Sequence, residues 1–535
     1  MVGGETATRH QRPLLGSAAL VSLATSLSRL GGLAREQLFA ALLGAGMYSD
    51  AFVVAFRIPN LLRDLLAEGA LSTAFVPTFT QHLLREGKPA AHALANLVLT
   101  TLFVVTCLVV IVGWIFAAPI VQSIAPGFAA TPGKIELTTT LTRILLPFLP
   151  MVALAAVLMG MSNAEQRFFV PALAPALFNV AAIAVALALL AGDFGDHPTV
   201  LAWTGAVLLG GFLQMAVQIP SLVRHGWRYE PRFRPRFDDP GLRRILRLMG
   251  PAVLGLSATQ VNIFVNNILA SQLVEGSASW LNYAFRLMQL PIGVFGVAVA
   301  TVSLTSLSRH AAALDMNAFR ATLADALRLI AFLTVPATAG LVALRQPIIE
   351  LLYEHGRFSA SDTAATAAVL SMYAVGLYAY AAVKVMAPAF YALQNARIPL
   401  AASACAVACN IAASLLLYRR LGAAGLALGT SVGAVVNLTI LYTSFVRRRG
   451  TLGELVLLGQ LGRVVLAALV MAIVCHWLAS ELNTRVPGNS IAADCVVTLV
   501  PIAIGAPIYF GLATLLRLPE ARLFKQRLLR RRTPA

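Results

Sequence analysis

Residues 28–80 read SRLGGLAREQLFAALLGAGMYSDAFVVAFRIPNLLRDLLAEGALSTAFVPTFT, and the charges in this stretch constrain the whole chain. The stretch is apolar enough to lie in a membrane, yet it carries four arginines and two prominent acids. These are Arg29, Arg35, Arg57, Arg63, Asp50 and Glu68. One arginine at the centre of a bilayer costs roughly 2.5–3.5 kcal/mol, so four facing lipid would cost about 10–14 kcal/mol. The arginines must therefore face water, one another or an anion.

The composition indicates a polytopic membrane protein. Of 535 residues, 58% are hydrophobic and 12% are charged, and the mean hydropathy is +0.78, whereas a soluble domain has about a quarter charged residues. The apolar stretch 14–43 is too long for the hydrophobic region of a cleaved signal peptide, so we expect it to remain as the first span. The five cysteines show neither a disulfide framework nor zinc-ligand spacing.

Apolar segments of about 20 residues each predict an all-α fold with fourteen transmembrane helices. The expected spans are 14–43, 48–80, 93–118, 136–160, 169–191, 199–223, 241–273, 277–308, 320–343, 364–393, 398–418, 422–446, 461–480 and 491–516.

The net charge of +18 reports topology rather than nucleic-acid binding, because the basic residues gather in short loops between the apolar segments. With the N-terminus inside, the largest basic groups, at 224–236, 447–449 and 522–532, all lie in the cytoplasm. The outer loops then hold scattered cations such as Lys134, with the adjacent Arg419 and Arg420 as the clear exception. This asymmetry predicts that both termini are cytoplasmic.

An internal repeat organises the chain. The segment AFRIPNL at 55–61 matches AFRLMQLP at 284–291, which aligns Arg57 with Arg286, and QRFFVP at 166–171 weakly matches QNARIP at 394–399. Both matches are offset by six spans. Because six is even, the two copies have the same orientation, which predicts two parallel six-helix lobes related by an axis along the membrane normal.

The repeat and the basic loops together predict the domain boundaries. These are a cytoplasmic N-terminus (1–13), a first lobe (14–224), a basic linker (225–240), a second lobe (241–446), two additional helices (447–516) and a basic cytoplasmic tail (517–535). Two facing lobes would enclose a central cavity lined by the first two helices of each lobe. The first lobe contributes four arginines and the second clearly contributes only Arg286, so the expected cavity is cationic and asymmetric.

Each charged candidate also has a less specific interpretation. An arginine near a helix end can extend to the headgroups, which fits Arg63 in part. Asp50 and Glu68 are candidate counter-ions for arginines, but Asp50 is equally compatible with an exposed loop. Lys384 either contacts substrate or pairs locally. Asn410 and Ser414 share one helix face and form either an interhelical hydrogen bond or a cation site without a carboxylate.

Enzyme motifs are absent from the sequence. The segment GFAATPGK at 127–134 has the wrong glycine spacing for a phosphate-binding loop, and Ile135 stands where Ser or Thr is required. The eight histidines lack metal-ligand spacing, and there is no nucleophile elbow. We therefore expect no catalytic residues, no metal and no cofactor, and any energy input must come from a gradient, the membrane potential or a partner.

Six segments together resemble the bacterial MurJ/MviN family, and the resemblance covers essentially the whole chain. They are SRLGGLAR (28–35), SDAF (49–52), IPNLLR (58–63), AEGA (67–70), FVP (75–77) and NYAFRLM (282–288). The resemblance implies the multidrug/oligosaccharidyl-lipid/polysaccharide exporter fold and a lipid II flippase of the bacterial inner membrane, acting in peptidoglycan synthesis. It further implies a monomer that contacts membrane lipids and cell-wall synthesis proteins, with no nucleic-acid partner.

The resemblance also implies roles for individual residues. Arg29, Arg35, Arg63 and Arg286 would bind the anionic headgroup of lipid II, an undecaprenyl-pyrophosphate-linked disaccharide-pentapeptide. Asp50 and Arg57 would be further functional positions, and the last two helices would form a groove for the polyprenyl tail. Sodium coupling is proposed for some members, but here Asn266, Asn267 and Ser414 stand where a cation site would need acids. The coupling ion is therefore left open.

The chemistry of the substrate agrees with this interpretation. A pyrophosphate and peptide carboxylates suit the planar fork of arginine. One alternative is an exporter of another polyprenyl-linked saccharide. A second is a drug exporter, but its cationic substrates would be repelled by this cavity. A third is a non-transporting scaffold of cell-wall assembly. A membrane glycosyltransferase would need acidic metal ligands or a catalytic base, which the sequence lacks.

The arginine asymmetry predicts that the 224–236 loop faces the cytoplasm. An Arg232→Cys variant should therefore resist a membrane-impermeant thiol reagent in intact cells and react only after the cells are opened. Labelling from outside intact cells would contradict the predicted topology.

Overall fold

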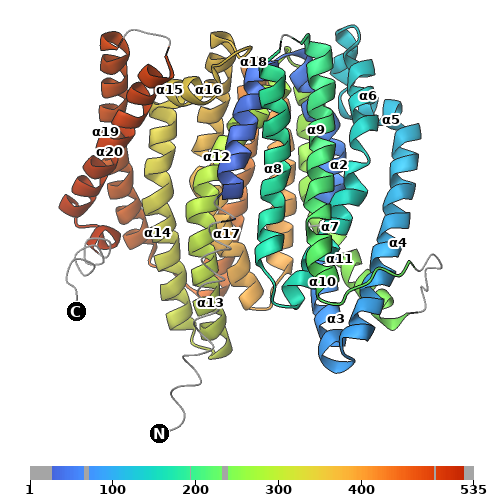
Figure 1. Cartoon of the computed structure of the whole chain (residues 1–535). Coiled ribbons are helices and arrows are strands. Elements are labelled where there is room, and N and C mark those ends of the chain that lie inside the picture. Colours follow the sequence, from blue (N-terminus) through green and yellow to red (C-terminus); the bar gives the residue numbers. More distant parts are fainter. Residues whose placement is uncertain are drawn as a thin grey trace, which may run out of the picture. The chain divides into compact units, whose positions relative to one another are not determined.

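The computed structural model describes residues 24, 27–64, 71–192, 194–231, 239–486 and 490–522 (Figure 1). Helices account for most of these residues and none of them lies in a strand, which confirms the all-α expectation. Glu68, a candidate counter-ion, and most of the basic tail lie outside the described residues. The chain divides into two compact units, Met1–Gly276 and Ser277–Ala535.

The first unit begins with a helix over residues 27–43. Its further helices are α2 (Met47–Arg63), α3 (Ser72–Arg85), α4 (Lys88–Ile115), α5 (Ala117–Ile124), the 3-10 turn η2 (Pro126–Ala130), α6 (Lys134–Leu145), α7 (Phe148–Ala164), α8 (Phe169–Leu190), α9 (Asp196–Ala216), α10 (Gln218–Arg224) and α11 (Pro240–Ser271).

The second unit contains the remaining helices, with α19 and α20 packed side by side (Figure 1). They are α12 (Ser277–Pro291), the π-helical segment η3 (Ile292–Gly296), α13 (Val297–Ala312), α14 (Met316–Ala343), α15 (Arg345–Tyr353), α16 (Ala360–Val375), α17 (Leu377–Ala392), α18 (Arg397–Arg449), α19 (Glu454–Arg485) and α20 (Ile491–Leu515).

Each of the fourteen expected spans contains helical residues, although several are broken. Within the described residues, nine helices are long and apolar enough to cross a membrane, or ten if α16 and α17, bent by 40°, form one span. Two expected spans, 398–418 and 422–446, run together in α18 and are separated only by a kink at Gly422, whose φ of 58° favours glycine. The count of fourteen stays a prediction.

The internal repeat appears as repeated helix packing within the two units. In the first unit, α2 packs on α6, and α3, α4 and α7 pack on one another. In the second unit, α12 packs on α16, and α13, α14 and α17 pack on one another in the same way. The same order of elements therefore builds both helix groups.

A rare backbone conformation also repeats at the position that the weak sequence match identified. Gln166 and Gln394 both adopt a left-handed conformation, with φ of 61° and 56°, which is uncommon for residues other than glycine. Each donates its N–H to the carbonyl three residues earlier. The following residues, Arg167 and Asn395, each donate to the carbonyl five residues earlier. The two copies thus end the equivalent helices α7 and α17 with the same cap, which also ends α13 at Leu314 and α20 at Arg517.

Helix α11 groups with the first unit, whereas the repeat assigned it to the second lobe. It packs on α3, α4, α5 and η2. Gly127 of η2 donates its N–H to the Ser271 hydroxyl at 3.2 Å, and a Cβ at Gly127 would lie 2.2 Å from the Ser271 carbonyl oxygen. Only glycine permits this approach. The lobe boundaries drawn from the repeat stay a prediction.

The last two helices pack on α14 through an apolar core of their own. Val464, Ala468 and Met471 of α19 join Tyr509 of α20 and Phe332 of α14 in this cluster. The Tyr509 hydroxyl donates to the Phe332 carbonyl at 2.8 Å, which satisfies a buried polar group. The pair that lies outside the internal repeat is therefore attached to the second unit.

Candidate functional site

The first helix presents Arg29 and Arg35 in different environments. Six residues separate them, so their side chains point about 120° apart on an α-helix. Arg29 is exposed. The Arg35 side chain is 12% exposed and donates to Glu36 at 2.6 Å, and its guanidinium carbon lies 5.1 Å from the centre of the Phe178 ring. Arg35 is therefore held in place by an acid and an aromatic ring that sequence reasoning did not single out.

The glycines of the SRLGGLAR motif allow this helix to approach α8. The Asn179 side chain donates to the Ser28 carbonyl at 2.8 Å. A Cβ at Gly31 would lie 3.3 Å from Cβ of Asn179, and Gly32 faces the same amide. An added methyl group at Gly31 would require Asn179 to move by a few tenths of an ångström, whereas one at Gly32 would only make ordinary contact with it. The glycine pair therefore positions the segment that carries Arg29.

Helix α2 carries three of the predicted functional side chains. Asp50 and Arg57 are seven residues apart, or about two turns, and so occupy one helix face. Asp50 is 2% exposed in the first turn, and Arg57 is partly buried. Near the other end, Arg63 donates to Asp64 at 3.0 Å, with its side chain 26% exposed. The exposed-loop interpretation of Asp50 is wrong, because Asp50 is helical and buried.

Asp50 forms a buried ion pair with Lys134, the first residue of α6. The Lys134 ammonium lies 3.0 Å from Asp50 Oδ2, and the two side chains are 3% and 2% exposed. The Gly276 N–H donates to the same oxygen at 2.8 Å, and the ammonium lies 4.3 Å from the centre of the Phe128 ring. A buried charge is tolerated only when paired and hydrogen-bonded, and this geometry supplies both.

The segment that follows α11 contacts the beginning of α2 at the same place. The Glu275 carboxylate accepts the Met47 N–H. The N-terminus of α2, which carries partial positive charge, thus receives the carboxylates of Glu275 and Asp50. We call Met47, Asp50, Lys134, Glu275 and Gly276 the Asp50 cluster. It joins α2, α6 and the segment that follows α11 within the first unit.

Arg286 lies in the second unit, on a polar stripe of α12. Asn282, Arg286 and Gln289 are spaced four and three residues apart and so share one face, and Arg286 and Gln289 are exposed. On the buried side, Tyr283 packs against Tyr353 at a ring-centre distance of 5.0 Å. Arg286 therefore stands on an exposed polar face of a helix whose opposite face is firmly packed.

The remaining polar candidates favour a structural role or stay open. Ser414 donates to Asn410 at 3.0 Å, and both side chains are buried. A Cβ at Gly429 would lie 2.4 Å from the Ser414 hydroxyl oxygen, and one at Gly433 would lie 2.9 Å from Asn410 Cβ. Such close contact of small residues is typical of packed membrane helices. Lys384 is exposed on α17.

The order of the helices and the charges inside apolar helices are those of a polytopic membrane protein with a transporter fold. The structure resembles an inward-facing multidrug resistance MATE family transporter of the MOP superfamily, with a TM-score of 0.65, 16% sequence identity, and coverage of 82% of this chain and 99% of that chain. At this identity the likeness shows the fold alone.

Sequence comparison then identifies the family. The model for "Lipid II flippase MurJ" matches residues 39–493. A probable lipid II flippase MurJ of Rhizobium meliloti is 37% identical, over 92% of this chain and 93% of the relative. Lipid II flippase MurJ of Burkholderia cenocepacia is 36% identical, over 92% and 95%. A solved lipid II flippase MurJ in an inward closed conformation has a TM-score of 0.77 and 27% identity, over 93% and 98%.

The chain belongs to the MurJ lipid II flippase family. This confirms the resemblance inferred from the sequence motifs and places the protein among transporters rather than enzymes. It is a multi-pass bacterial membrane protein. The sequence did not identify four residues that contact the candidate site, because the role of each follows only from the residue that it contacts in the fold. They are Glu36, Lys134, Asn179 and Glu275.

The buried Asp50–Lys134 pair should stabilise the protein far more than an exposed pair does. Replacing Lys134 by Met should lower the free energy of unfolding by about 3–5 kcal/mol, because it leaves a buried carboxylate without its cation. An Asp50→Asn/Lys134→Met double variant should recover part of that loss. The check is a double-mutant cycle by thermal unfolding in detergent, with the exposed Glu481–Arg485 pair as control, which should couple by less than about 1 kcal/mol. Equal coupling in the two pairs would contradict the prediction.

Proposed function

We propose that this chain moves lipid II from the inner to the outer leaflet of the cytoplasmic membrane by alternating access and so supplies peptidoglycan synthesis. The observation that carries the proposal is family membership over residues 39–493, supported by relatives of 36–37% identity along most of the chain. The intramembrane arginines add a chemical reason. A substrate with a pyrophosphate and carboxylates needs cations that remain inside the protein while it crosses.

We assign the binding of the headgroup's negative groups to Arg29, Arg35, Arg63 and Arg286. Arg29 and Arg286 are exposed on their own units, as residues that meet a large polar headgroup must be. Arg35 is oriented by Glu36 and Phe178, and such preorganisation reduces the entropy lost on binding. The pair of Arg63 with the partly exposed Asp64 is weak enough to exchange for a phosphate.

We assign gating or charge pairing to Asp50, Arg57 and Glu68. The support comes from the Asp50 cluster, where one ion pair and two backbone N–H groups join α2, α6 and the segment that follows α11. Gly276 directly precedes α12, the helix that bears Arg286. A rearrangement that separates α2, α6 and the segment after α11 must break the buried ion pair and both hydrogen bonds, which would favour one of two discrete states over a continuum.

Further proposals follow from the sequence. Both termini lie in the cytoplasm, the protein acts as a monomer, and its partners besides lipid II are membrane lipids and proteins of cell-wall synthesis. The basic loops fix the orientation of the helices in the membrane and do not bind nucleic acid. The groove for the polyprenyl tail lies on the last two helices.

Neutralising the proposed headgroup ligands should abolish function without unfolding the protein. Arg29→Ala, Arg35→Ala and Arg286→Ala should each fail to support growth of cells depleted of their own flippase, because each removes a cation from the anionic substrate. Protein abundance in the membrane should stay near normal. Arg485→Ala, at an exposed arginine of α19, is the matched control and should support growth. Growth of all three variants would refute the headgroup assignment.

The membrane potential should influence the transport cycle. A charge crossing the whole field gains about 2.3 kcal/mol per 100 mV, and a partial displacement gains proportionally less. An inside-negative potential would draw the empty cationic site back toward the cytoplasm once the anionic headgroup has left. The test is translocation in proteoliposomes with a potassium–valinomycin potential in sodium-free buffer. Rates that ignore the sign of the potential would refute the idea, and rates restored only by sodium would indicate a cation site.

A further inference from the structure

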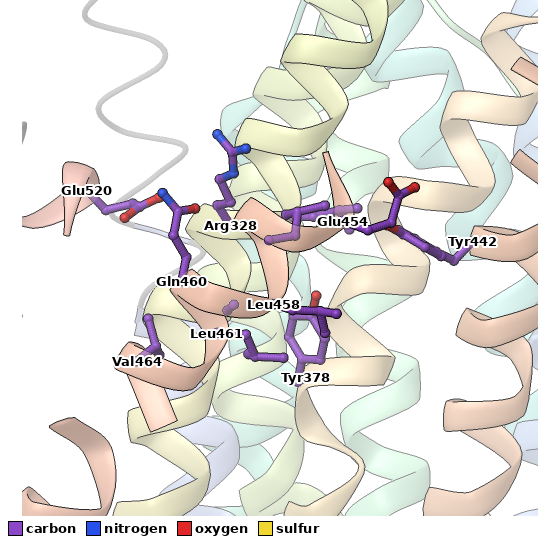
Figure 2. A pocket seen from close by; sticks show the side chains of 12 residues that line it. Arg328, Tyr378, Tyr442, Glu454, Leu458, Gln460, Leu461, Val464 and Glu520 are labelled. Carbon is purple, nitrogen blue, oxygen red and sulfur yellow. The ribbon is translucent and has the colours of Figure 1, made fainter. Parts of the chain in front are cut away.

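A pocket in the second unit lies apart from the proposed headgroup ligands. It is formed by α14, α17, α18 and α19 together with Glu520, and its cavity volume is about 180 Å³ (Figure 2). The six α19 residues in its wall lie between Glu454 and Val464, close to the predicted cytoplasmic loop at 447–453. The parts of the pocket that α18 and the start of α19 supply therefore lie near helix ends, where a membrane protein meets lipid headgroups, whereas the α14 part lies near the middle of that helix.

The two sides of the pocket differ in polarity. Figure 2 shows Glu520, Gln460, Arg328 and Glu454 along one side, with Leu458, Leu461 and Tyr378 along the other. Val464 lies below Gln460 in the same view, and Leu327 is a further apolar residue of the lining. A site that is apolar on one side and charged on the other fits an amphiphile. In a membrane, the amphiphile present in excess is a phospholipid.

Two buried polar atoms in the pocket wall have unmet hydrogen-bonding capacity. Arg328 pairs with Asp325 through Nη1 at 3.2 Å, but its Nε finds no acceptor among the described residues. Gln460 Oε1 is likewise buried and finds no donor there. Leaving such groups unsatisfied costs about 1–3 kcal/mol each. A ligand that satisfied both atoms would bring one acceptor and one N–H or O–H donor.

The charges in the wall determine which donor fits. Among the described residues that line the pocket, Glu454 and Glu520 occur with one cation, Arg328, whose partner Asp325 is a third acid. Glu520 is only 8% exposed, and the Glu454 carboxylate accepts the Leu452 N–H at 3.4 Å. A buried carboxylate is stabilised chiefly by a cation. The net charge of the protein is +18, but the wall of this pocket is acidic. The pocket therefore disfavours an anionic ligand, although the protein as a whole would attract one.

We propose that this pocket binds a phospholipid with a primary ammonium headgroup, of the phosphatidylethanolamine class. The phosphate accepts from Arg328 Nε, and the ammonium donates to Gln460 and to the carboxylate of Glu520, which lies beside it, while Glu454 adds negative charge on the other side of Arg328 (Figure 2). The acyl chains lie against Leu327, Leu458 and Leu461. Phosphatidylcholine has no N–H to donate, and phosphatidylglycerol brings a net negative charge, so neither fits all of these groups.

This lipid is distinct from the transported substrate. The proposal uses no residue assigned to the lipid II headgroup, so it stands or fails independently of the flippase function. A bare polyprenyl phosphate would satisfy Arg328 and the apolar side, but it would leave Gln460 without a donor and both carboxylates without a cation. The polar side of the pocket therefore discriminates between a membrane aminophospholipid and a polyprenyl tail.

The test is native mass spectrometry of the full-length protein incubated with equal amounts of phosphatidylethanolamine, phosphatidylglycerol and phosphatidylcholine of identical acyl chains. The expected result is preferential retention of phosphatidylethanolamine, by about tenfold, which corresponds to about 1.4 kcal/mol. Equal retention of the three lipids, or preference for either of the other two, overturns the proposal without any variant. Displacement of phosphatidylethanolamine by an equal amount of undecaprenyl phosphate also overturns it.

Variants locate the preference. Gln460→Leu and Glu520→Gln should each reduce it severalfold, and Arg328→Gln should weaken retention of all three lipids. Glu481→Gln, at an exposed acid elsewhere on α19, is the matched control and should bind as the unaltered protein does. Thermal unfolding midpoints establish that each variant is folded. Unchanged preference in the folded Gln460→Leu and Glu520→Gln variants would place the lipid elsewhere and overturn the assignment.

Discussion

The cost of taking charge out of water is the constraint on which this structure depends. An apolar chain can carry charged side chains only where each is exposed to water, paired with an opposite charge or hydrogen-bonded. Asp50 and Lys134 meet this requirement through one another and the Gly276 N–H. Arg35 meets it through Glu36, and Arg29 by remaining exposed. The buried charges therefore require contacts between specific helices, and the exposed charges require positions that water can reach.

Small residues provide the close contacts that these pairings require. Gly31 and Gly32 bring the first helix to Asn179, and Gly127 brings η2 against the end of α11. The second contact lies at the same end of α11 as the Asp50 cluster. Glycine packing and ion pairing thus act together to attach α11 to the first unit, although its place in the repeat assigns it to the second lobe.

The two copies of the repeat have kept their backbone geometry and diverged in their charge. The paired left-handed glutamines and the recurring helix contacts show the common plan. Arg57 and Arg286 occupy aligned positions, yet Arg57 is partly buried and Arg286 is exposed. The last two helices lie outside the duplication and pack on α14. The first of them, α19, also provides half of the residues that line the pocket with the acidic wall.

The sequence by itself determined the helical class, the approximate spans, the repeat and the family, because hydropathy, loop charge and motif spacing are properties of neighbouring residues. It also identified Arg29, Arg35, Asp50 and Arg286 as exceptional, since charge within an apolar segment is visible locally. Only the tertiary structure decided that Lys134 is the partner of Asp50, 84 positions away, and that α11 joins the first unit. Ion pairs and helix contacts between distant segments depend on distances that folding creates, and hydropathy along the chain does not encode them.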